Sequence, residues 1–558
     1  MANTDEAIFF QPMLDATSRV DADELVDVVF EQCCAGVTFY ERKANPARGA
    51  KRQLKVLLLN LLLSVDRTFP LALPLSPRTY DLARYQKANV SYNITKKLLD
   101  QLVEHELVTL RLGSEFTGYS RLTATHLLTN IFKALKLTDK LIDWSNVETV
   151  LMFDKDDKKK RKEVDYEDTD EVIEWRTLLK RYNELLRSSL IDIPEQEKYL
   201  ARFEKNGKPR IENLKNIHVR RSFSRSSWDC NGRFYGGFWI RINKEQRDKI
   251  YIDGEPTVSF DFSSLHPNLL YAIEKTQPPS DDIYDIGLSQ ADLVMNEDAN
   301  RPPYPIDSPK YFRDKWIKPL VLTGLNAADD TKTCGAYLDK QDNGHRLKRL
   351  KHTELKQILD AFRKAHPTIS KYVSADAGIW LMRMDSNICE HVIRTMTKKN
   401  KPVLTVHDGF ICKRRDAFDL LDAMMTGSYK VVGKPLPLDL EMWKDKQEQN
   451  VQTKLTELQI AADLLDGLAN QTEDRSLENM TLLSQAIMQL TYETEKERSQ
   501  QDDNKDTRLR FAAKIMNKTK KQVISKRAKG DLLNWLQEQG INAYQVFEDH
   551  YSHYYKEH

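Results

Sequence analysis

The chain has 558 residues, enough for two or three domains, and a hydrophobic content of 40% is adequate for a packed core in each. Its formal net charge is only +2 although 30% of its residues are charged, so bulk charge gives no argument for nucleic-acid binding. Its six cysteines lack CxxC or Cys/His spacing, which indicates reduced thiols and no structural zinc. No signal-peptide pattern or membrane-spanning apolar run is present, so we expect a cytoplasmic protein without a membrane partner.

Residues 1–150 predict a winged helix-turn-helix-like domain. Apolar helical patterns at 53–65 and 93–108 precede two strand-like runs that turn between Gly113 and Gly118. In such a fold the second helix enters the major groove of DNA. The residues that would contact DNA are Ser91, Asn93, Lys96, Lys97 and Arg121. Docking to another protein is the alternative role of this domain.

Residues 154–171 carry both charge signs in blocks without apolar periodicity, which predicts a solvated linker at 151–172. An amphipathic, basic helix pattern begins the next segment, 173–215, and a plain surface helix would show the same pattern. Near the other end, 446–506 predicts a polar helical tether. Residues 507–558 are basic and end in aromatics, which predicts a helical module that binds nucleic acid or a partner, or packs on the preceding domain.

A stretch from 220 to 256 interleaves arginines with aromatic residues and glycines. Arginines bind phosphates through planar forks and aromatic rings stack on bases, so the pattern suits a nucleic-acid strand. An ordinary glycine-rich surface hairpin is the alternative. The residues that would contact a primer or template here are Arg220, Arg221, Arg225, Arg233, Tyr235 and Arg247.

Two aspartates about 150 residues apart each follow a short apolar strand-like run. Asp261 ends an alternating run and precedes an apolar helix pattern, and Asp408 lies in a tight turn between strand-like runs at 403–406 and 410–412. Such carboxylates could converge on two divalent cations roughly 3.5–4 Å apart, as two-metal phosphoryl transfer requires. A single strand-end aspartate is more often a turn former or a helix cap.

The strings around both aspartates resemble motifs of the palm-domain polymerases. DFSSLHPNLLYA, which begins at Asp261, resembles motif A of family A and family B enzymes. VHDGF resembles motif C of family A DNA polymerases and single-subunit phage RNA polymerases, with Gly409 where these carry Glu or Ser. Residues 375–400 form a long helix pattern that matches in position the helix beneath the palm, and plain core would look the same.

The fingers helix of that family is matched only in part. In KPLVLTGLNA, Lys318 stands eight residues before Asn326 and Ala327, where the family carries Tyr and Gly. The arginine expected four residues before the lysine is Asp314, and Arg313 is its neighbour. Lys318 could also be a lysine that extends from an apolar helix to solvent.

The resemblance covers about Arg220 to Lys413 and implies an α+β right-hand polymerase. Palm and fingers, with an antiparallel palm sheet, would occupy 216–445, and 173–215 would be a small thumb. Asp261, Asp408 and the main-chain carbonyl of Phe262 would hold two Mg²⁺ ions, or Mn²⁺ in their place.

The resemblance also implies the contacts to the substrates. Lys318, with Arg313 as a second contact, would meet the triphosphate of the incoming nucleotide. His266, five residues after Asp261, would sense the sugar of the nucleotide. Asn326 would be a further nucleotide contact, and in an RNA polymerase it could act with His266 on the 2′-hydroxyl. His407 would position the primer end.

We therefore expect a nucleotidyltransferase, most simply a DNA polymerase of a phage, plasmid or mobile element. Its partners would be a nucleic-acid template and primer and nucleoside triphosphates. An RNA polymerase or primase on the same palm is the first alternative. The second is a winged-helix DNA-binding replication or regulatory protein with an inactive palm, because Asp314, Asn326 and Ala327 depart from the family pattern.

Overall fold

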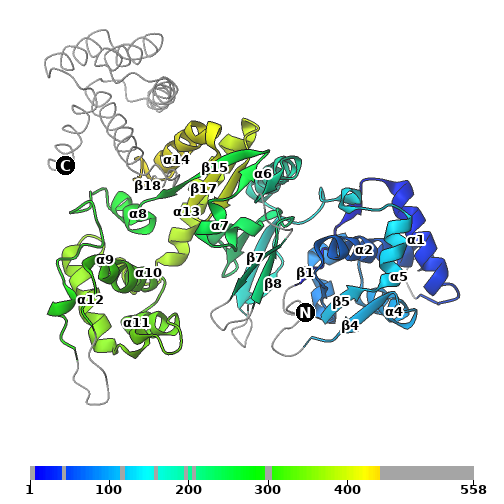
Figure 1. Cartoon of the computed structure of the whole chain (residues 1–558), viewed down its shortest axis with the longest axis horizontal. Helices are drawn as coiled ribbons and strands as arrows, with labels where there is room; N and C mark the ends of the chain where they lie inside the picture. The colour runs from blue at the N-terminus through cyan, green and yellow to red at the C-terminus, as the bar shows by residue number, and fades with distance from the viewer. Residues whose placement is uncertain are drawn as a thin grey trace, which may run out of the picture. The chain divides into compact units, whose positions relative to one another are not determined.

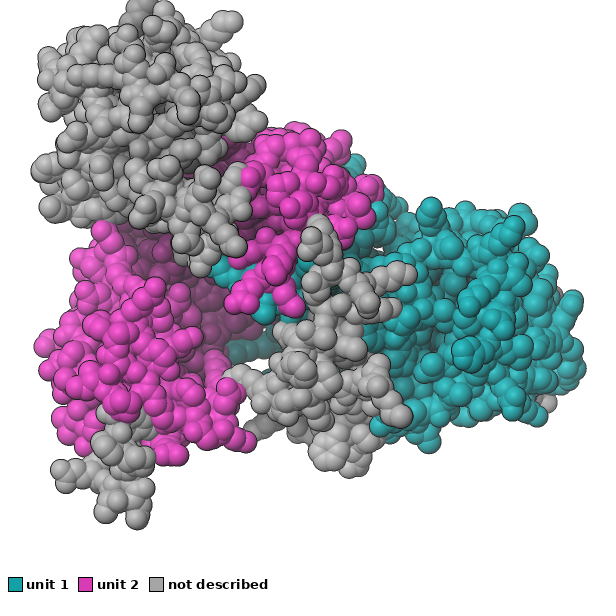
Figure 2. Space-filling view, viewed as in Figure 1, with its two compact units in different colours: residues 1–187, 193–227, 235–244 teal, residues 188–192, 228–234, 245–558 magenta. Residues whose placement is uncertain are grey.

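The structure is a computed structural model that describes residues 7–39, 46–113, 120–155, 161–193, 199–203, 209–295 and 305–439. Two compact units divide the chain (Figure 2). Unit 1 takes 1–187, 193–227 and 235–244, and unit 2 takes 188–192, 228–234 and 245–558. In the described ranges, helices and several separate sheets without a barrel form a mixed α/β fold, consistent with the α+β prediction. No helix in these ranges is long and apolar enough to cross a membrane.

The first part of unit 1 packs helices on a small sheet (blue in Figure 1). α2 (Pro46–Arg67) is buried along much of its length because its leucines occur on every side. α4 (Tyr92–Glu104) buries one face, and β4 (Val108–Arg111) pairs antiparallel with β5 (Ser120–Ala124). The sheet order is β1-β3-β5-β4. The remaining elements are α1 (Arg19–Cys33), α3 (Ala83–Lys87), α5 (His126–Ala134), β1 (Ile8–Phe9), β2 (Asp15–Ala16), β3 (Leu71–Leu73) and β6 (Ile142–Asp143).

Both helices and the strand pair occur where the sequence predicts a winged helix-turn-helix. The expected turn of the wing includes 114–119, which lies outside the described residues. The assignment to the winged-helix class stays a prediction.

The structure differs from the linker expected at 151–172. β7 (Val150–Lys155) and β8 (Arg161–Val164) pair antiparallel and belong to a sheet of order β13-β12-β7-β8. β7 forms because 150–152 is a buried apolar run. The charged β8 lies at the edge of this sheet, where lysines are tolerated because they discourage pairing with other chains.

The predicted helical segment 173–215 is helical only at its start. α6 (Asp170–Ser188) buries its apolar stripe, but β9 (Ile191–Asp192) follows, and β10 (Tyr199–Phe203) pairs antiparallel with β11 (Pro209–Asn213). β12 (Val219–Ser224) then runs parallel to β7, and β13 (Ser227–Gly236) follows it.

Unit 2 is built on a sheet of order β16-β17-β15-β14-β9, with β18 (Leu438–Asp439) also paired to β15. β15 (Glu255–Phe262), β16 (Val403–Val406) and β17 (Gly409–Lys413) are antiparallel neighbours, and β14 (Tyr251–Ile252) continues the sheet. Their apolar side chains, including Phe260 and Phe410 in register, are buried. These strands and the turn between β16 and β17 occur where the sequence predicts them.

Helices complete unit 2 (green to yellow in Figure 1). α8 (Leu265–Ile273) follows β15 directly, while α13 (Gly378–Lys398) and α14 (Ala417–Val432) pack against each other and against the sheet. The others are α7 (Lys244–Arg247, shared with unit 1), α9 (Pro309–Tyr311), α10 (Lys318–Leu325), α11 (Asp330–Asp339) and α12 (His352–Ala365). The predicted tether 446–506 and module 507–558 lie outside the described residues.

Candidate active site

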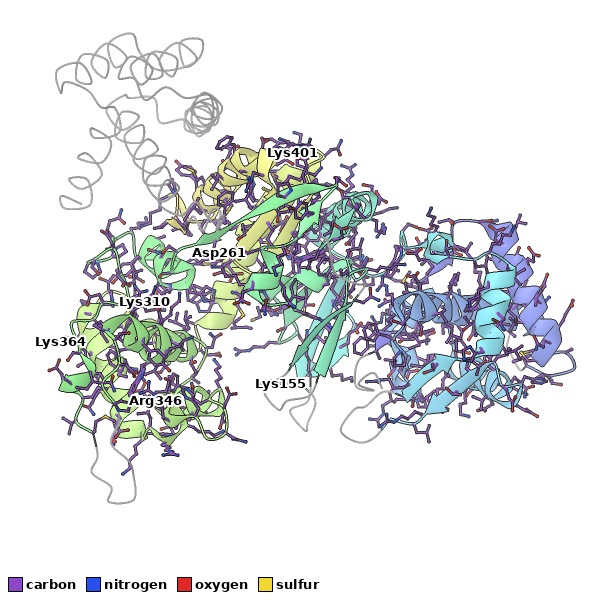
Figure 3. The ribbon with its side chains drawn as sticks, in the orientation of Figure 1. Lys155, Asp261, Lys310, Arg346, Lys364 and Lys401 are labelled. Carbon is purple, nitrogen blue, oxygen red and sulfur yellow. The ribbon has the colours of Figure 1, made fainter. Side chains whose placement is uncertain are left out.

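Two adjacent antiparallel strands bring Asp261 and Asp408 together. Asp261 in β15 is in register with Gly409, the first residue of β17, and Asp408 immediately precedes that residue. The backbone N–H of Phe262 donates to the carbonyl of Asp408 over 3.4 Å. Figure 3 shows Asp261 near the end of its strand, close to the start of α8. The carboxylate of Asp261 is exposed and that of Asp408 is half-buried, so both can reach a ligand in solution.

Gly409 makes room for this pair. A Cβ at position 409 would overlap Oδ1 of Asp261, so the Asp261 carboxylate lies directly against the glycine backbone. A Glu or Ser at this position would displace the carboxylate. The residue that departs from motif C is therefore the one that this side-chain packing requires.

The turn between β16 and β17 is a two-residue turn with His407 in the left-handed region, at φ +60°. Burial lowers the pKa of the His407 imidazole below its usual value, and nearby Arg233 and Arg247 lower it further. The charges of Asp408 and Asp385 raise this pKa but do not reverse the shift. His407 therefore lies within electrostatic range of two arginines that the sequence predicts as primer or template contacts. At neutral pH its ring is uncharged and can accept a hydrogen bond.

Arg233 and His266, predicted for different roles, meet on one buried carboxylate, Asp385 of α13. Nε of Arg233 lies 3.0 Å from both oxygens of Asp385, and Nη2 makes a further ion pair with Oδ2. Nε2 of His266 lies 2.8 Å from the same Oδ2. The Asp385 side chain is 1% exposed, so this cluster joins β13, α8 and α13 in the interior of unit 2.

The geometry fixes the His266 tautomer. An unprotonated nitrogen 2.8 Å from a carboxylate oxygen would be repelled, so Nε2 carries its proton toward Asp385. Nη2 of Arg233 stands 3.2 Å from the same nitrogen without donating to it. The far edge of the His266 ring is thereby held in a single orientation.

Lys318 and Arg313 lie in the predicted order but have different surroundings. Lys318 begins α10, and its Nζ lies 5.7 Å from the ring centroid of Tyr284. Burial raises the pKa of the Tyr284 phenol, and the charges of Asp282 and Asp408 raise it further, so this ring lies near Asp408. Tyr284 thus connects the predicted triphosphate lysine to the aspartate pair.

Arg313 is already neutralised by carboxylates. It lies in the π-helical turn Phe312–Ile317 and forms ion pairs with Asp282 at 2.7 Å and with Asp314 at 2.9 Å. Those hydrogen bonds raise the pKa of its guanidinium. A triphosphate would have to compete with two carboxylates for this side chain.

Asn326 caps the end of α10 and packs on the start of α13. Its Nδ2 donates to the carbonyl of Leu322 at 2.8 Å, and a Cβ at Gly378 would overlap its amide. Among the described residues no hydrogen bond or ion pair connects Asn326 to His266, and their joint contact with a nucleotide sugar stays a prediction.

The remaining arginine-rich residues divide between the units. Arg247 belongs to α7 in unit 2, while Arg220, Arg221, Arg225 and Tyr235 belong to unit 1. Arg221 is fully buried, with its guanidinium 4.7 Å from the ring centroid of Trp175 and 5.2 Å from that of Phe223. Arg225 lies in the turn after β12 at φ +59°. Tyr235 is half-buried on β13.

The predicted DNA-contacting residues of the first domain lie on α4 and β5. Asn93 is exposed near the start of α4, and Lys96 forms an ion pair with Asp100. Lys97 donates to the carbonyl of Thr38, and Arg121 is half-buried in β5. Ser91, at the N-cap of α4, is exposed as well, so Ser91 and Asn93 are accessible to a ligand, whereas Lys96 would have to leave Asp100 to bind one.

The donor set fits divalent cations that are shared with a substrate. Within the described residues no three His, Cys, Asp or Glu side chains cluster closely enough to hold a metal by themselves. Two carboxylates and the Phe262 carbonyl leave coordination positions for phosphate oxygens and water, which Mg²⁺ commonly keeps. The Asp408 carboxylate makes no hydrogen bond or ion pair with any described residue, so it is available as a ligand.

Sequence reasoning missed two residues of this site. They are Asp385 on α13 and Tyr284 before α10. A charged residue inside the apolar stripe of a long helix is a signal for a buried ion pair, so Asp385 could have been found. Tyr284 lies in a segment without periodicity and gave no signal.

No protein-family model matches this chain, and no curated protein matches its sequence.

Proposed function

We propose that this chain is a template-directed nucleotide polymerase that uses two-metal phosphoryl transfer. The observation that carries the proposal is the register of β15 and β17, which places Asp261 opposite Gly409 and beside Asp408. The order of the elements agrees with the motif resemblance, since α8 and α10 follow β15, and α13 directly precedes β16 and β17. DNA is the product we propose first.

In this proposal, Asp261, Asp408 and the carbonyl of Phe262 hold two Mg²⁺ ions. The bound ions would activate the attacking hydroxyl and neutralise the developing charge on the phosphoryl group and the leaving oxygen. Lys318 would bind the triphosphate as a point charge. His407, uncharged at neutral pH because of its lowered pKa, would accept a hydrogen bond from the primer end.

An inactive palm in a DNA-binding replication or regulatory protein is the second candidate. The observation that favours it is the pairing of Arg313 with Asp282 and Asp314, which removes one cation from the predicted triphosphate site. An RNA polymerase or primase would use the same aspartates. It would differ only in that His266 would accept the ribose 2′-hydroxyl and not exclude it.

The test is nucleotide incorporation by the full chain with Mg²⁺, labelled dNTPs or NTPs, and primed or unprimed templates. Asp261→Asn and Asp408→Asn should each reduce incorporation by roughly a hundredfold or more, because each removes a charge that no neighbour replaces. Asp339→Asn, an exposed aspartate at the end of α11, is the matched control and should leave the rate unchanged. Substantial incorporation by both site variants would exclude two-metal catalysis at this pair. A wild-type chain that binds DNA but never incorporates would favour the inactive palm.

A further inference from the structure

A polar cavity lies in unit 1. It has a volume of about 330 Å³, within the lower range of small-molecule sites. One stripe of α6 faces it, because Arg176, Lys180, Asn183 and Arg187 recur at the helical period and all line the cavity. Residues of α3, β8 and the chain around Trp144 and His218 complete the wall.

The carboxylates of this cavity already have partners. Glu148 and Asp168 both pair with Arg176, at 2.9 and 2.7 Å. Glu163 pairs with Arg84 at 2.9 Å, and Asp165 accepts from the backbone N–H of Ala83 at 2.8 Å. Glu163 also attracts Arg220 electrostatically, but among the described residues none of these carboxylates forms an ion pair with Arg187 or Lys180.

The remaining basic groups carry buried nitrogens without partners. Within the described residues, both ring nitrogens of His218, Nη1 of Arg187, Nε of Arg67 and Nε of Arg220 are buried and have no hydrogen-bond partner. Asp143 and Glu184 attract Arg187 electrostatically, but neither forms an ion pair with it in the described chain. Of these residues, Arg187 and His218 line the cavity. Buried donors without acceptors are costly, so an acceptor that enters the cavity from solvent would satisfy them.

The electrostatics agree with this geometry. Burial, followed by the charges of Arg187, Arg67 and Arg220, lowers the pKa of the His218 imidazole to about 3, so all three arginines lie close to the ring. Burial also lowers the pKa of Arg67 to about 10. His218 is therefore uncharged at neutral pH and offers one N–H donor beside three guanidinium groups.

We infer that this cavity binds a phosphate group, contacted by Arg187 and His218, with Arg67 and Arg220 supplying further positive charge behind them. A phosphate monoester carries a charge near −2 and several acceptor oxygens, whereas a carboxylate carries a single charge among three guanidinium groups. The Trp144 ring, stacked on His218 with centroids 4.9 Å apart, lies beside the site. The cavity is larger than one phosphate and leaves space for an attached sugar or base.

Two sources can supply this phosphate, a free nucleotide or the phosphorylated end of a nucleic-acid strand. The full chain is titrated in EDTA with three probes, namely ATP, a 5′-phosphorylated single-stranded DNA decamer and the same decamer with a 5′-hydroxyl, and binding is followed by calorimetry. EDTA suppresses metal-dependent nucleotide binding at the aspartate pair. Tight binding of ATP alone assigns a free nucleotide, and a preference for the phosphorylated decamer over its hydroxyl form assigns a strand end.

Arg187→Gln should weaken binding of the preferred probe by roughly tenfold or more, because a charge-assisted hydrogen bond is lost. Arg78→Gln, which removes an exposed arginine of the same unit, is the matched control and should bind as the wild type does. His218→Gln provides a second variant should Arg187→Gln fold poorly by circular dichroism. The inference is overturned if the wild type binds no phosphate probe, or if both cavity variants bind as tightly as the wild type. The inference is also overturned if Lys318→Gln removes binding and Arg187→Gln does not. The phosphate would then bind at the proposed polymerase site, so that proposal would stand while this inference fails.

Discussion

Nε2 of His266 donates to Oδ2 of Asp385 at 2.8 Å, and this bond joins the helix after β15 to the helix before β16. The ring proposed to sense the sugar of an incoming nucleotide is therefore held by a carboxylate 119 residues away in the chain. Its orientation is set by the interior of unit 2 and not by the substrate. An anchored ring discriminates by size, because it cannot turn away from a clash.

His266→Ala should increase ribonucleotide incorporation relative to deoxyribonucleotide incorporation, because it removes the bulk beside the 2′-hydroxyl. Asp385→Asn should shift the ratio in the same direction but less, since it keeps the ring and weakens its anchor. The measurement is kcat/KM for dNTPs and NTPs on one primed template. His352→Ala, an exposed histidine of α12, is the control. A native preference for NTPs that His266→Ala removes would instead indicate an RNA polymerase.

Arg233 and Asp385 should be strongly coupled in stability. Arg233→Met or Asp385→Leu alone should lower the free energy of unfolding by about 3–5 kcal/mol, because each leaves an unpaired charge in a buried place. The double variant should lose much less than the sum of the single losses, because no unpaired charge remains. Urea unfolding of the four proteins measures the coupling. Additive losses would show that the pair contributes little to folding.

Gly409→Ala should disturb the aspartate pair without a change of charge. The added Cβ would overlap the Asp261 carboxylate, so we expect a loss of about 1–3 kcal/mol of stability together with most of the incorporation activity. Gly335→Ala is the matched control, since no atom lies within 4 Å of a Cβ there and a helix interior gains about 0.5–1 kcal/mol from alanine. Thermal unfolding and primer extension of both variants test the prediction. An active Gly409→Ala protein would contradict the packing described for the pair.

If α4 contacts the phosphate backbone, Lys96→Gln should weaken the salt dependence of duplex DNA binding. The slope of the logarithm of the binding constant against the logarithm of salt concentration should fall by about one unit. A point substitution is preferable to deletion of residues 1–160, because that deletion would remove β7 from between β12 and β8. Lys133→Gln, exposed on α5, is the control. Binding measured by fluorescence anisotropy at several salt concentrations decides the matter. Equal slopes for both variants would favour a protein-docking role for this domain.

His391 should make the chain less stable in mild acid. Burial, followed by the charges of Lys430 and Arg394, lowers its pKa to about 4, while Glu390 acts in the opposite direction. Between pH 6.5 and about 4 the unfolded chain then binds the extra proton, so stability falls as pH falls through this window. We expect His391 to lower the free energy of unfolding by about 2 kcal/mol across this window, after allowance for its partial exposure. His391→Gln should flatten the pH dependence of urea unfolding in that range, and an unchanged profile would contradict the prediction.

The strands that carry the aspartates follow from local sequence. Alternating apolar residues and a two-residue turn at His407 are short-range signals, and the structure has β15, β16 and β17 where they indicate strands. Helices α8 and α13 follow in the same way from apolar periodicity. Local pattern is sufficient there because each element buries a regular face.

The remaining parts depend on partners far away in the chain. Charged β8 forms a strand because β7 is held by β12, and nothing within 161–164 reveals that. Arg221 resembles a phosphate contact in the sequence, yet it is buried against Trp175, 46 positions earlier. The contacts among Arg233, His266 and Asp385 likewise result from tertiary packing. These residues are too far apart in the sequence for a local pattern to predict their contacts.

The two compact units are interleaved along the chain, since the backbone passes between them after residues 187, 192, 227, 234 and 244. During synthesis, unit 1 cannot be completed until residue 244 has left the ribosome, and by then two pieces of unit 2 have already emerged. Those pieces, 188–192 and 228–234, must wait for the strands and helices they pack with. Arg233 belongs to the second piece, so its Asp385 partner is made only after a further 150 residues or so have been translated. A nascent chain that stalls in this interval would expose an arginine whose place in the interior does not yet exist.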